Sequence, residues 1–339
     1  MKLAVWGAGL IGRKHAQLVH QQNALAAIAD PNPQIETMCQ ELGCAFYPTP
    51  QACLEAQNLD GVIIATPNQT HVQHLDLCLS RGLPVMIEKP IADKAVNATP
   101  LVQLAEDQNV PILVAHHRRH NPISQRANQC ISEGTLGQIH AVSGHFLLHK
   151  PEDYFETVWR RQAGAGPIFI NLIHDVDLLR FLIGEIRSVQ AVQSSRARGF
   201  EVEDTAAVLI EFENGVLGTF VLSDAVSAPW SWEFTAGENP AYPHIPTDAY
   251  RIAGTHGSLS FPDLKLWSHV NTRSWWEPIE ARQLNVETYD PLVAQIQHFM
   301  DVCRGATPIV SGRDGLRSLQ VVEAIKRAAD TGVAVSLEQ

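Results

Sequence analysis

The stretch Gly7-Ala8-Gly9-Leu10-Ile11-Gly12 directly follows the apolar run Leu3–Trp6 and precedes an amphipathic segment. A strand, a glycine-rich turn and a helix in this order are typical of dinucleotide-binding α/β domains. In that reading Gly7 permits the tight turn, Gly9 lets the backbone approach a diphosphate, and Gly12 lets the helix pack closely on the strand. The pattern therefore predicts both the fold of the first domain and its ligand.

The helix after this turn is expected to begin at Leu10 and Ile11, whose N–H groups and positive dipole end would face the phosphates. Asp30 ends the next apolar run, at about the offset expected of an acid that binds the ribose hydroxyls. Because a carboxylate repels a 2′-phosphate, Asp30 favours NAD over NADP. A glycine-rich turn in a domain that binds no nucleotide stays open as the alternative.

Short apolar runs and amphipathic stretches alternate over residues 1–120. The runs predict strands that are buried on both faces of a parallel sheet, and the amphipathic stretches predict the helices between them. The expected strands are Leu3–Trp6, Leu25–Ala29, Ala45–Tyr47, Val62–Ala65, Val85–Ile87 and Ile112–Ala115. This alternation predicts a doubly wound α/β Rossmann domain.

Residues 121–339 have a different pattern, with longer strands that alternate apolar and polar residues. The clearest hairpin joins Thr205–Phe212 to Val216–Asp224 through Asn214-Gly215, a dipeptide typical of tight hairpin turns. One apolar helix is expected over Ile168–Ile183 and one strand over Tyr250–Ser260. The pattern predicts an α+β domain with an antiparallel or mixed sheet and helices on one face.

Length and charge exclude several classes of protein. At roughly 150 residues per domain, 339 residues are expected to form two domains. The net charge of −11 argues against nucleic acid or an anionic membrane surface as a partner. The chain shows no apolar run of membrane-spanning length. We expect no secretory leader, because Leu3–Trp6 leads straight into the glycine-rich turn. The six cysteines lack metal-site spacing, so we expect reduced thiols, a cytoplasmic location and no metal.

Two further strand ends carry polar residues. Thr66-Pro67-Asn68-Gln69-Thr70-His71 follows one expected strand, and Glu88-Lys89-Pro90 follows another. The carboxyl ends of parallel strands are where open α/β sheets bind ligands. Taken alone, the tripeptide could still be an ordinary polar loop.

These motifs together resemble the Gfo/Idh/MocA oxidoreductases, typified by glucose–fructose oxidoreductase and inositol dehydrogenase. The resemblance covers nearly the whole chain, because further matching motifs occur in the second half. They are Trp159-Arg160-Arg161, Gly164-Ala165-Gly166-Pro167, His174–Arg180, Gly184 and Gly312–Arg317.

The resemblance implies an NAD-dependent dehydrogenase with Lys89 near the nicotinamide and His174 as the second catalytic residue. Such a reaction removes a hydride and a proton, so it requires a positioned base. By the same resemblance the second domain has an open, predominantly antiparallel sheet, binds the substrate and mediates oligomerisation, so the protein is expected to be a homodimer or homotetramer. The substrate that the resemblance implies is a sugar, a cyclitol or a related polyhydroxy acid. The expected cofactor contacts are Gly7, Gly9, Leu10, Ile11, Gly12, Asp30, Thr66, Pro67, Asn68, His71, Glu88 and Lys89.

One position departs from the family pattern. The family often carries an aspartate four residues before the catalytic histidine, and here that residue is Ile170. Asn171 stands beside it and could bind a substrate hydroxyl or orient His174, but an amide is no general base. Lys89 and His174 are therefore the minimal catalytic pair. Without the resemblance, His174 could equally be a structural residue of an apolar helix.

Two pairs of adjacent arginines flank the expected site elements. Guanidinium groups recognise carboxylates and phosphates, so Arg119 and Arg160 are expected to contact an anionic substrate together with Trp159. Solvated surface charge or salt bridging is the alternative interpretation. The neighbouring His116, His117 and His120 are expected to line the site or a hinge, without a metal, since no carboxylate or cysteine shares their spacing.

Two other functions compete with a net dehydrogenase. An enzyme of the same fold could oxidise and re-reduce its substrate within one cycle, and so cleave glycosides or isomerise sugars. A non-catalytic, NAD-sensing regulator is the third reading, because a fold alone does not determine function.

Overall fold

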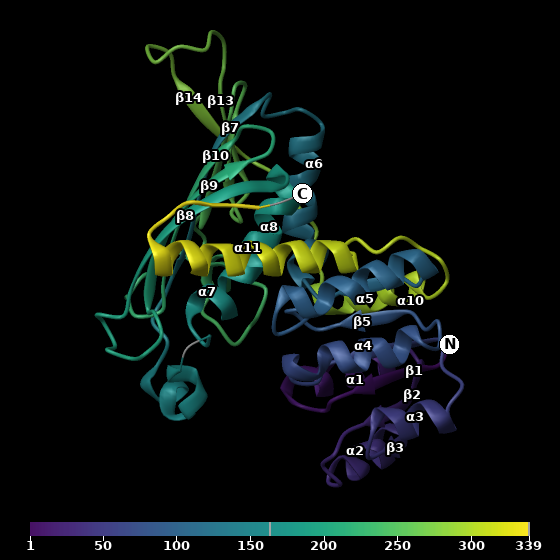
Figure 1. The fold of residues 1–339 in the computed structure, drawn as a ribbon. Helices are drawn as coiled ribbons and strands as arrows, with labels where there is room; N and C mark the ends of the chain where they lie inside the picture. Colours follow the sequence, from purple (N-terminus) through teal and green to yellow (C-terminus); the bar gives the residue numbers. More distant parts are fainter. Residues whose placement is uncertain (163, 338–339) are drawn as a thin grey trace. The chain divides into compact units, whose positions relative to one another are not determined.

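The structure is a computed structural model that describes residues 1–162 and 164–337. The chain packs into two compact units (Figure 1). The first comprises residues 1–120 and 289–319, and the second comprises residues 121–288 and 320–339, of which 338 and 339 lie outside the described residues. Each unit has its own cluster of buried apolar side chains.

The first unit is built on a parallel sheet of six strands in the order β3-β2-β1-β4-β5-β6. The strands are β1 (Leu3–Trp6), β2 (Leu25–Ala29), β3 (Ala45–Tyr47), β4 (Gly61–Ile64), β5 (Val85–Ile87) and β6 (Ile112–Val114). The order reverses beside β1, as in a doubly wound Rossmann sheet. The predicted fold class of the first domain is confirmed.

Helices connect these strands and cover the sheet. They are α1 (Leu10–Gln21), α2 (Ile35–Leu42), α3 (Pro50–Ala56), η1 (Asn68–Thr70), α4 (His71–Leu79), α5 (Ala95–Gln108) and η2 (His117–His120). Residues 289–319 add α10 (Pro291–Val302), which packs against α1 and η2 and buries Ile296 and Phe299 in this core. The first domain predicted from the sequence, residues 1–120, did not include this segment. The apolar pattern of an amphipathic helix does not indicate which of two cores the helix will pack against.

The second unit is built on a nine-stranded sheet in the order β14-β13-β12-β11-β7-β10-β9-β8-β15. Its strands are β7 (Ile139–Leu147), β8 (Ile186–Ser194), β9 (Thr205–Phe212), β10 (Leu217–Ser223), β11 (Tyr250–Gly254), β12 (Ser258–Phe261), β13 (Lys265–His269), β14 (Ile279–Gln283) and β15 (Val335–Ser336). The paired strands are antiparallel except for β7 and β10, which run parallel. The expected predominantly antiparallel sheet is confirmed.

Helical segments connect the strands of the second unit. They are α6 (Pro122–Ser132), η3 (Glu152–Glu156), η4 (Val158–Arg161), α7 (Pro167–Ile170), α8 (Leu172–Ile183) and α9 (Trp232–Thr235). The division between the units falls within α11 (Gly312–Thr331), after Leu319. None of the helices in the described part of the chain is both long and apolar enough to span a membrane.

Two expected elements are each divided in two. The single helix predicted over Ile168–Ile183 was wrong: α7 ends at Ile170 and α8 begins at Leu172, with Asn171 between them at φ −105° and ψ −52°. The single strand over Tyr250–Ser260 was also wrong, because it turns back as β11 and β12. A Cβ on Gly254 would lie only 2.2 Å from the Leu136 carbonyl oxygen, which accepts hydrogen bonds from the turn at His256.

Candidate functional site

The glycine turn after β1 requires glycine at two positions. Gly7 has φ +87°, and a Cβ there would lie 2.7 Å from the carbonyl oxygen of Ala65, at the end of β4. A Cβ on Gly12 would lie 1.9 Å from the carbonyl oxygen of Gly7. Backbone atoms therefore occupy the positions that a Cβ would take at Gly7 and Gly12. Glycine at these two positions allows the tight turn and the close packing of α1 against it.

Gly9 faces the opposite situation, since a Cβ there would meet nothing within 4 Å. Helix α1 begins one residue later, and within the described structure no side chain caps its first turn. Leu10 is 95% exposed. The amides at this helix start are therefore uncovered, and the open backbone at Gly9 fits the close approach of a dinucleotide diphosphate.

Asp30 is fixed beside this turn. One carboxylate oxygen accepts the Ala8 N–H at 2.7 Å, and the other accepts the Asn32 N–H at 2.8 Å. The carboxylate thus lies at the carboxyl end of β2 next to the glycine turn. Uncovered amides with an acid at the neighbouring strand end fit the diphosphate and ribose of a dinucleotide.

Two buried histidines hold the residues on either side of Lys89. His15, on α1, lies with Nε2 2.7 Å from Oε1 of Glu88, so that its N–H donates to the carboxylate. His71, at the start of α4, has Nδ1 2.9 Å from the Pro90 carbonyl oxygen and Nε2 2.9 Å from that of Thr66. We call these two residues the histidine bracket. It ties the Lys89 backbone to α1, to α4 and to the end of β4.

The pKa values of the bracket follow from its burial and charges. Burial raises the pKa of Glu88, but the hydrogen bond and charge of His15 and the charges of Lys89 and His117 outweigh it and hold the pKa below its usual value. Burial lowers the pKa of His71 more than its two carbonyl partners raise it. Glu88 is thus an anion at neutral pH. His71 is a neutral imidazole and donates its single N–H to one of the two carbonyl oxygens.

The parallel pair β7 and β10 positions a polar cluster in the second unit. Because these strands run parallel, their carboxyl ends lie at the same edge of the sheet, followed by Lys150 and Asp224. Lys150 Nζ lies 3.2 Å from Asp224 Oδ2 and 2.8 Å from Asn171 Oδ1. Burial lowers the pKa of Lys150, while the partner Asp224 raises it by a smaller amount. Lys150 was not expected from the sequence.

Arg198 completes this cluster from the loop between β8 and β9. Its Nε donates to Asp224 Oδ1 at 3.1 Å, Nη1 donates to Glu152 at 3.1 Å, and Nη2 donates to the Lys150 carbonyl oxygen at 2.8 Å. Asp224 therefore bridges the two buried cations Lys150 and Arg198. Asn171 connects the cluster to α8, whose first turn carries the half-buried His174.

The other predicted site residues lie in different surroundings. Thr66 contacts His74 and Thr70 through its hydroxyl at 3.0 and 2.9 Å, and Pro67 and Asn68 follow it at the surface end of β4. Arg119 is buried in the first unit, where Nη1 lies 3.3 Å from Asp314 Oδ1. Arg160 and Trp159 lie on η4 in the second unit, and Trp159 is 53% exposed.

The structure thus gathers the expected cofactor residues in the first unit and Asn171, His174, Trp159 and Arg160 in the second. His116 and His120 are buried in the first unit, where the His120 ring lies 5.3 Å from that of His298. The long segment Ala225–Asp248 contains α9 and buries Trp232.

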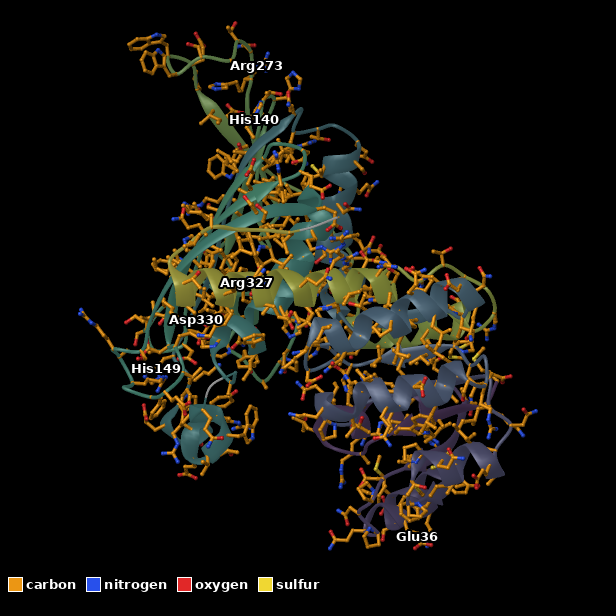
Figure 2. All side chains as sticks on the ribbon, in the orientation of Figure 1. Glu36, His140, His149, Arg273, Arg327 and Asp330 are labelled. Carbon is orange, nitrogen blue, oxygen red and sulfur yellow. The ribbon has the colours of Figure 1, made fainter. Side chains whose placement is uncertain are left out.

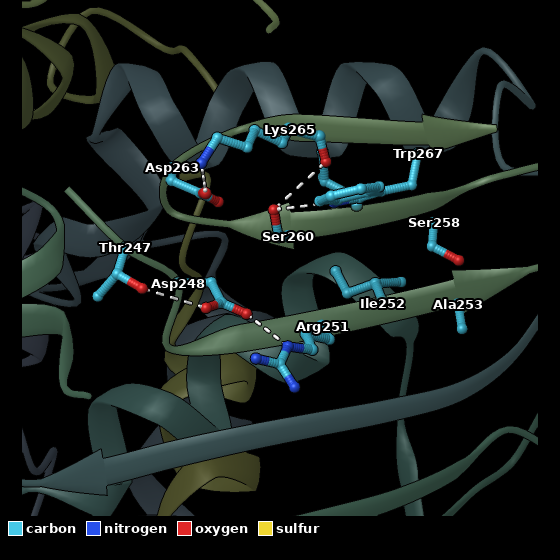
Figure 3. A pocket seen from close by; sticks show the side chains of 11 residues that line it. Thr247, Asp248, Arg251, Ile252, Ala253, Ser258, Ser260, Asp263, Lys265 and Trp267 are labelled. Atoms are coloured by element: carbon cyan, nitrogen blue, oxygen red, sulfur yellow. Dashed lines mark hydrogen bonds and ion pairs between the residues drawn. The ribbon is translucent and has the colours of Figure 1, made fainter. Parts of the chain in front are cut away.

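A pocket of about 440 Å³ opens elsewhere, on the face of β11, β12 and β13 (Figure 3). Its charged side chains pair with one another, Arg251 with Asp248 at 2.6 Å and Lys265 with Asp263 at 3.1 Å. None of the site residues predicted from the sequence lines it.

Comparison with protein families matches both halves of the chain. Residues 1–116 match the model described as an oxidoreductase family with an NAD-binding Rossmann fold. Residues 124–260 match the GFO/IDH/MocA C-terminal domain.

Individual relatives match over almost the full length. The chain is 28% identical to the rhizopine catabolism protein MocA of Rhizobium meliloti, over 95% of this chain and 93% of that protein. It is 24% identical to the myo-inositol 2-dehydrogenase of Thermotoga maritima, over 100% and 99%. The solved WlbA dehydrogenase of Chromobacterium violaceum, in complex with NADH and UDP-GlcNAcA, superposes with a TM-score of 0.77 at 25% identity, covering 100% of this chain and 96% of that one. With its NAD-binding Rossmann domain and its mostly antiparallel second sheet, the chain belongs to the Gfo/Idh/MocA family of oxidoreductases.

Proposed function

We propose that the protein is an NAD-dependent dehydrogenase that oxidises a secondary hydroxyl of a sugar, a cyclitol or a related polyhydroxy acid, or reduces the corresponding ketone. The observation that carries this proposal is the position of Lys89. Strands β1, β4 and β5 are neighbours in the parallel sheet, so the glycine turn, Thr66 and Lys89 all follow strands at one edge. The histidine bracket keeps the backbone of Lys89 at that edge.

The chemistry assigns separate tasks to the residues. The nicotinamide, when bound, accepts or donates the hydride. Lys89 Nζ holds the reacting hydroxyl, and the His174 imidazole takes its proton. A histidine suits this task because its usual pKa lies near neutral pH. Asn171 donates to a substrate hydroxyl through its amide, since its Oδ1 is already bonded to Lys150.

The remaining cofactor contacts belong to the same proposal. The amides of Leu10 and Ile11 with the backbone of Gly9 bind the diphosphate, and Thr66, Pro67, Asn68, His71 and Glu88 shape the nicotinamide side of the site. Asp30 binds the adenosine ribose and disfavours a 2′-phosphate, so NAD is preferred over NADP. The names of the relatives, among them D-apiose dehydrogenase and myo-inositol 2-dehydrogenase, support a polyhydroxylated substrate.

The experiment is a scan of NADH absorbance with NAD⁺ and a panel of sugars, cyclitols, sugar acids and sugar phosphates. NADH formation with one compound class supports the dehydrogenase. Conversion of the substrate with retained cofactor and no net NADH identifies the internal redox cycle instead. NAD binding without conversion of any compound supports the regulator and rejects the dehydrogenase.

Assembly and location are part of the proposal as well. Large apolar side chains stand exposed on the outer face of the second sheet, Val192 at 65%, Leu209 at 55% and Leu217 at 62%. We propose that a second copy of the chain covers them in a homodimer or homotetramer, which light scattering would measure. The loop between β13 and β14, where Arg273 lies (Figure 2), also exposes Trp275 and Trp276.

The cellular location is proposed from the cysteines. The free thiols of the described residues suit the reducing cytoplasm, and cell fractionation tests that location.

A further inference from the structure

We propose that Arg160, assisted by Lys150, forms a subsite for a negatively charged oxygen group of the substrate. That group is a carboxylate or a phosphate ester, so the substrate would be an acidic derivative of a sugar or polyol. The inference rests on the proposed function and specifies the class of its substrate.

The guanidinium of Arg160 is held in place without a carboxylate. Its Nη1 donates to the Tyr154 carbonyl oxygen at 2.8 Å. Its central carbon lies 4.1 Å from the centroid of the Tyr154 ring and 5.6 Å from that of Trp159. Its buried Nε has no hydrogen-bond partner among the described residues. Two aromatic rings and one carbonyl therefore fix the group while leaving N–H donors for a ligand.

The surrounding charges leave Arg160 uncompensated. Asp224 pairs with Lys150 and with Arg198, and Glu152 pairs with Arg198. Glu233 acts on Lys150, whose pKa it raises. In the ranges that the structure describes, no carboxylate forms an ion pair with Arg160. A half-buried guanidinium without a counter-ion favours binding of an anion.

Lys150 extends this subsite towards the proposed proton acceptor. Its Nζ lies 4.9 Å from the centroid of the same Tyr154 ring. An ammonium group carries three N–H donors, and the described acceptors Asn171 and Asp224 take two of them. Because Asn171 begins the helix that carries His174, contacts lead from Arg160 through Tyr154 and Lys150 to the proposed catalytic histidine within one unit.

An anion gains more from these donors than a neutral hydroxyl does. A hydrogen bond to a charged group contributes more binding free energy than one between neutral groups. The difference corresponds to roughly tenfold in affinity for one such bond. Arg160 can bind a carboxylate or phosphate through two N–H groups, which a single hydroxyl does not match.

Equilibrium binding tests this inference. The NADH-loaded protein is titrated by calorimetry with two series of pyranoses that differ only at C6, namely D-glucose, D-glucuronate and D-glucose 6-phosphate, and the three galactose counterparts. We expect the acids of at least one series to bind at least tenfold tighter than the neutral sugar. Comparing the affinities of the uronates with those of the 6-phosphates identifies whether the subsite prefers a carboxylate or a phosphate ester.

Variants separate the subsite from general effects of charge. Arg160→Gln should weaken binding of the acid roughly tenfold to a hundredfold and change neutral-sugar binding by less than about threefold. Arg160→Lys keeps the positive charge but not the two parallel N–H donors of the guanidinium, so we expect an intermediate loss of affinity for the acid. This variant replaces Arg160→Gln if the glutamine variant does not fold. Arg161→Gln is the matched control, because it removes the same charge from the exposed neighbouring residue.

Two outcomes would overturn the inference. Acids that bind no tighter than the neutral sugars reject it, and so does an acid preference that survives in Arg160→Gln. Failure here is distinguishable from failure of the proposed function. NADH formation with neutral sugars alone keeps the dehydrogenase and rejects only the anionic subsite.

Discussion

His15 Nε2 donates to Glu88 Oε1 at 2.7 Å, and this bond joins the helix of the glycine turn to the residue before Lys89. His15 is completely buried and Glu88 nearly so. One side-chain contact thereby connects the glycine turn, where the diphosphate is proposed to bind, to the backbone of Lys89. The bond contributes to position rather than to chemistry, because neither group is proposed to contact the reacting atoms.

Replacing His15 by Leu should lower kcat more than it raises the KM for substrate. The substitution removes the donor to Glu88, so the Lys89 backbone loses one of its two fixed neighbours. We expect kcat to fall by about tenfold or more, because misplacement by about an ångström can cost a hundredfold. Steady-state kinetics measure the split. His20→Leu, on the exposed side of the same helix, is the control, and equal effects of the two variants would contradict the positioning role.

Replacing His71 by Phe should destabilise the first unit. The ring is kept, but the carbonyl oxygen of Thr66 or Pro90 that accepts the single N–H of His71 loses its donor in a buried site. Leaving a buried acceptor unsatisfied costs about 1–3 kcal/mol. Urea unfolding measures this loss. An unchanged midpoint would show that the carbonyls find other donors and that His71 does not hold the Pro90 segment.

Replacing Lys89 by Met should abolish turnover and leave the dissociation constant of NADH within about threefold. Methionine retains much of the length and apolar character of the side chain but carries no ammonium group. We expect the rate to fall by at least about a hundredfold, as is typical for loss of an acid–base group. Fluorescence titration with NADH provides the control for an intact cofactor site. Near-normal turnover would rule out the proposed role of Lys89.

Replacing Asp30 by Asn should shift cofactor preference towards NADP. The amide keeps the size of the side chain but loses the charge that disfavours a 2′-phosphate. We expect the NAD⁺-to-NADP⁺ ratio of kcat/KM to fall by about tenfold or more, since hydrogen bonds to charged groups contribute about 1.5–3 kcal/mol. Asp60→Asn, at an exposed position before β4, is the control. An unchanged ratio would place cofactor discrimination elsewhere.

The stability of the protein should decrease in acid through Glu88. The pKa of this carboxyl is lowered by folding, so the unfolded chain binds more protons between the two pKa values. The stabilisation is therefore complete above the usual pKa of 4.5 and is lost as the pH falls through the folded value. Urea midpoints from pH 7 to pH 3 measure it. Glu88→Gln should flatten this part of the curve, and a wild-type slope in the variant would contradict the assignment.

Local patterns predicted the parts of the structure that depend on local backbone geometry. The glycine turn, Asp30 and the six short strands follow from residue spacing, because each feature is determined within a few neighbouring positions. The break at Asn171 was missed because the apolar pattern continues across it, while Lys150, which contacts Asn171, lies in the distant segment after β7.

Lys150 and Asp224 could not be paired from the sequence. Alternating patterns identify β7 and β10 as strands, but they do not reveal that these two run parallel in an otherwise antiparallel sheet. Residues 289–319 were likewise placed by packing, because their helices bury apolar side chains in a core formed far earlier in the chain.

The parallel pairing of β7 and β10 has an evolutionary consequence. Both strands end at the same edge of the sheet. The two segments that follow them can therefore change in length or in sequence while the backbone hydrogen bonds between the strands are preserved. Descendants of this scaffold could thus acquire new ligand preferences by remodelling two adjacent loops, without redesigning the framework that supports them.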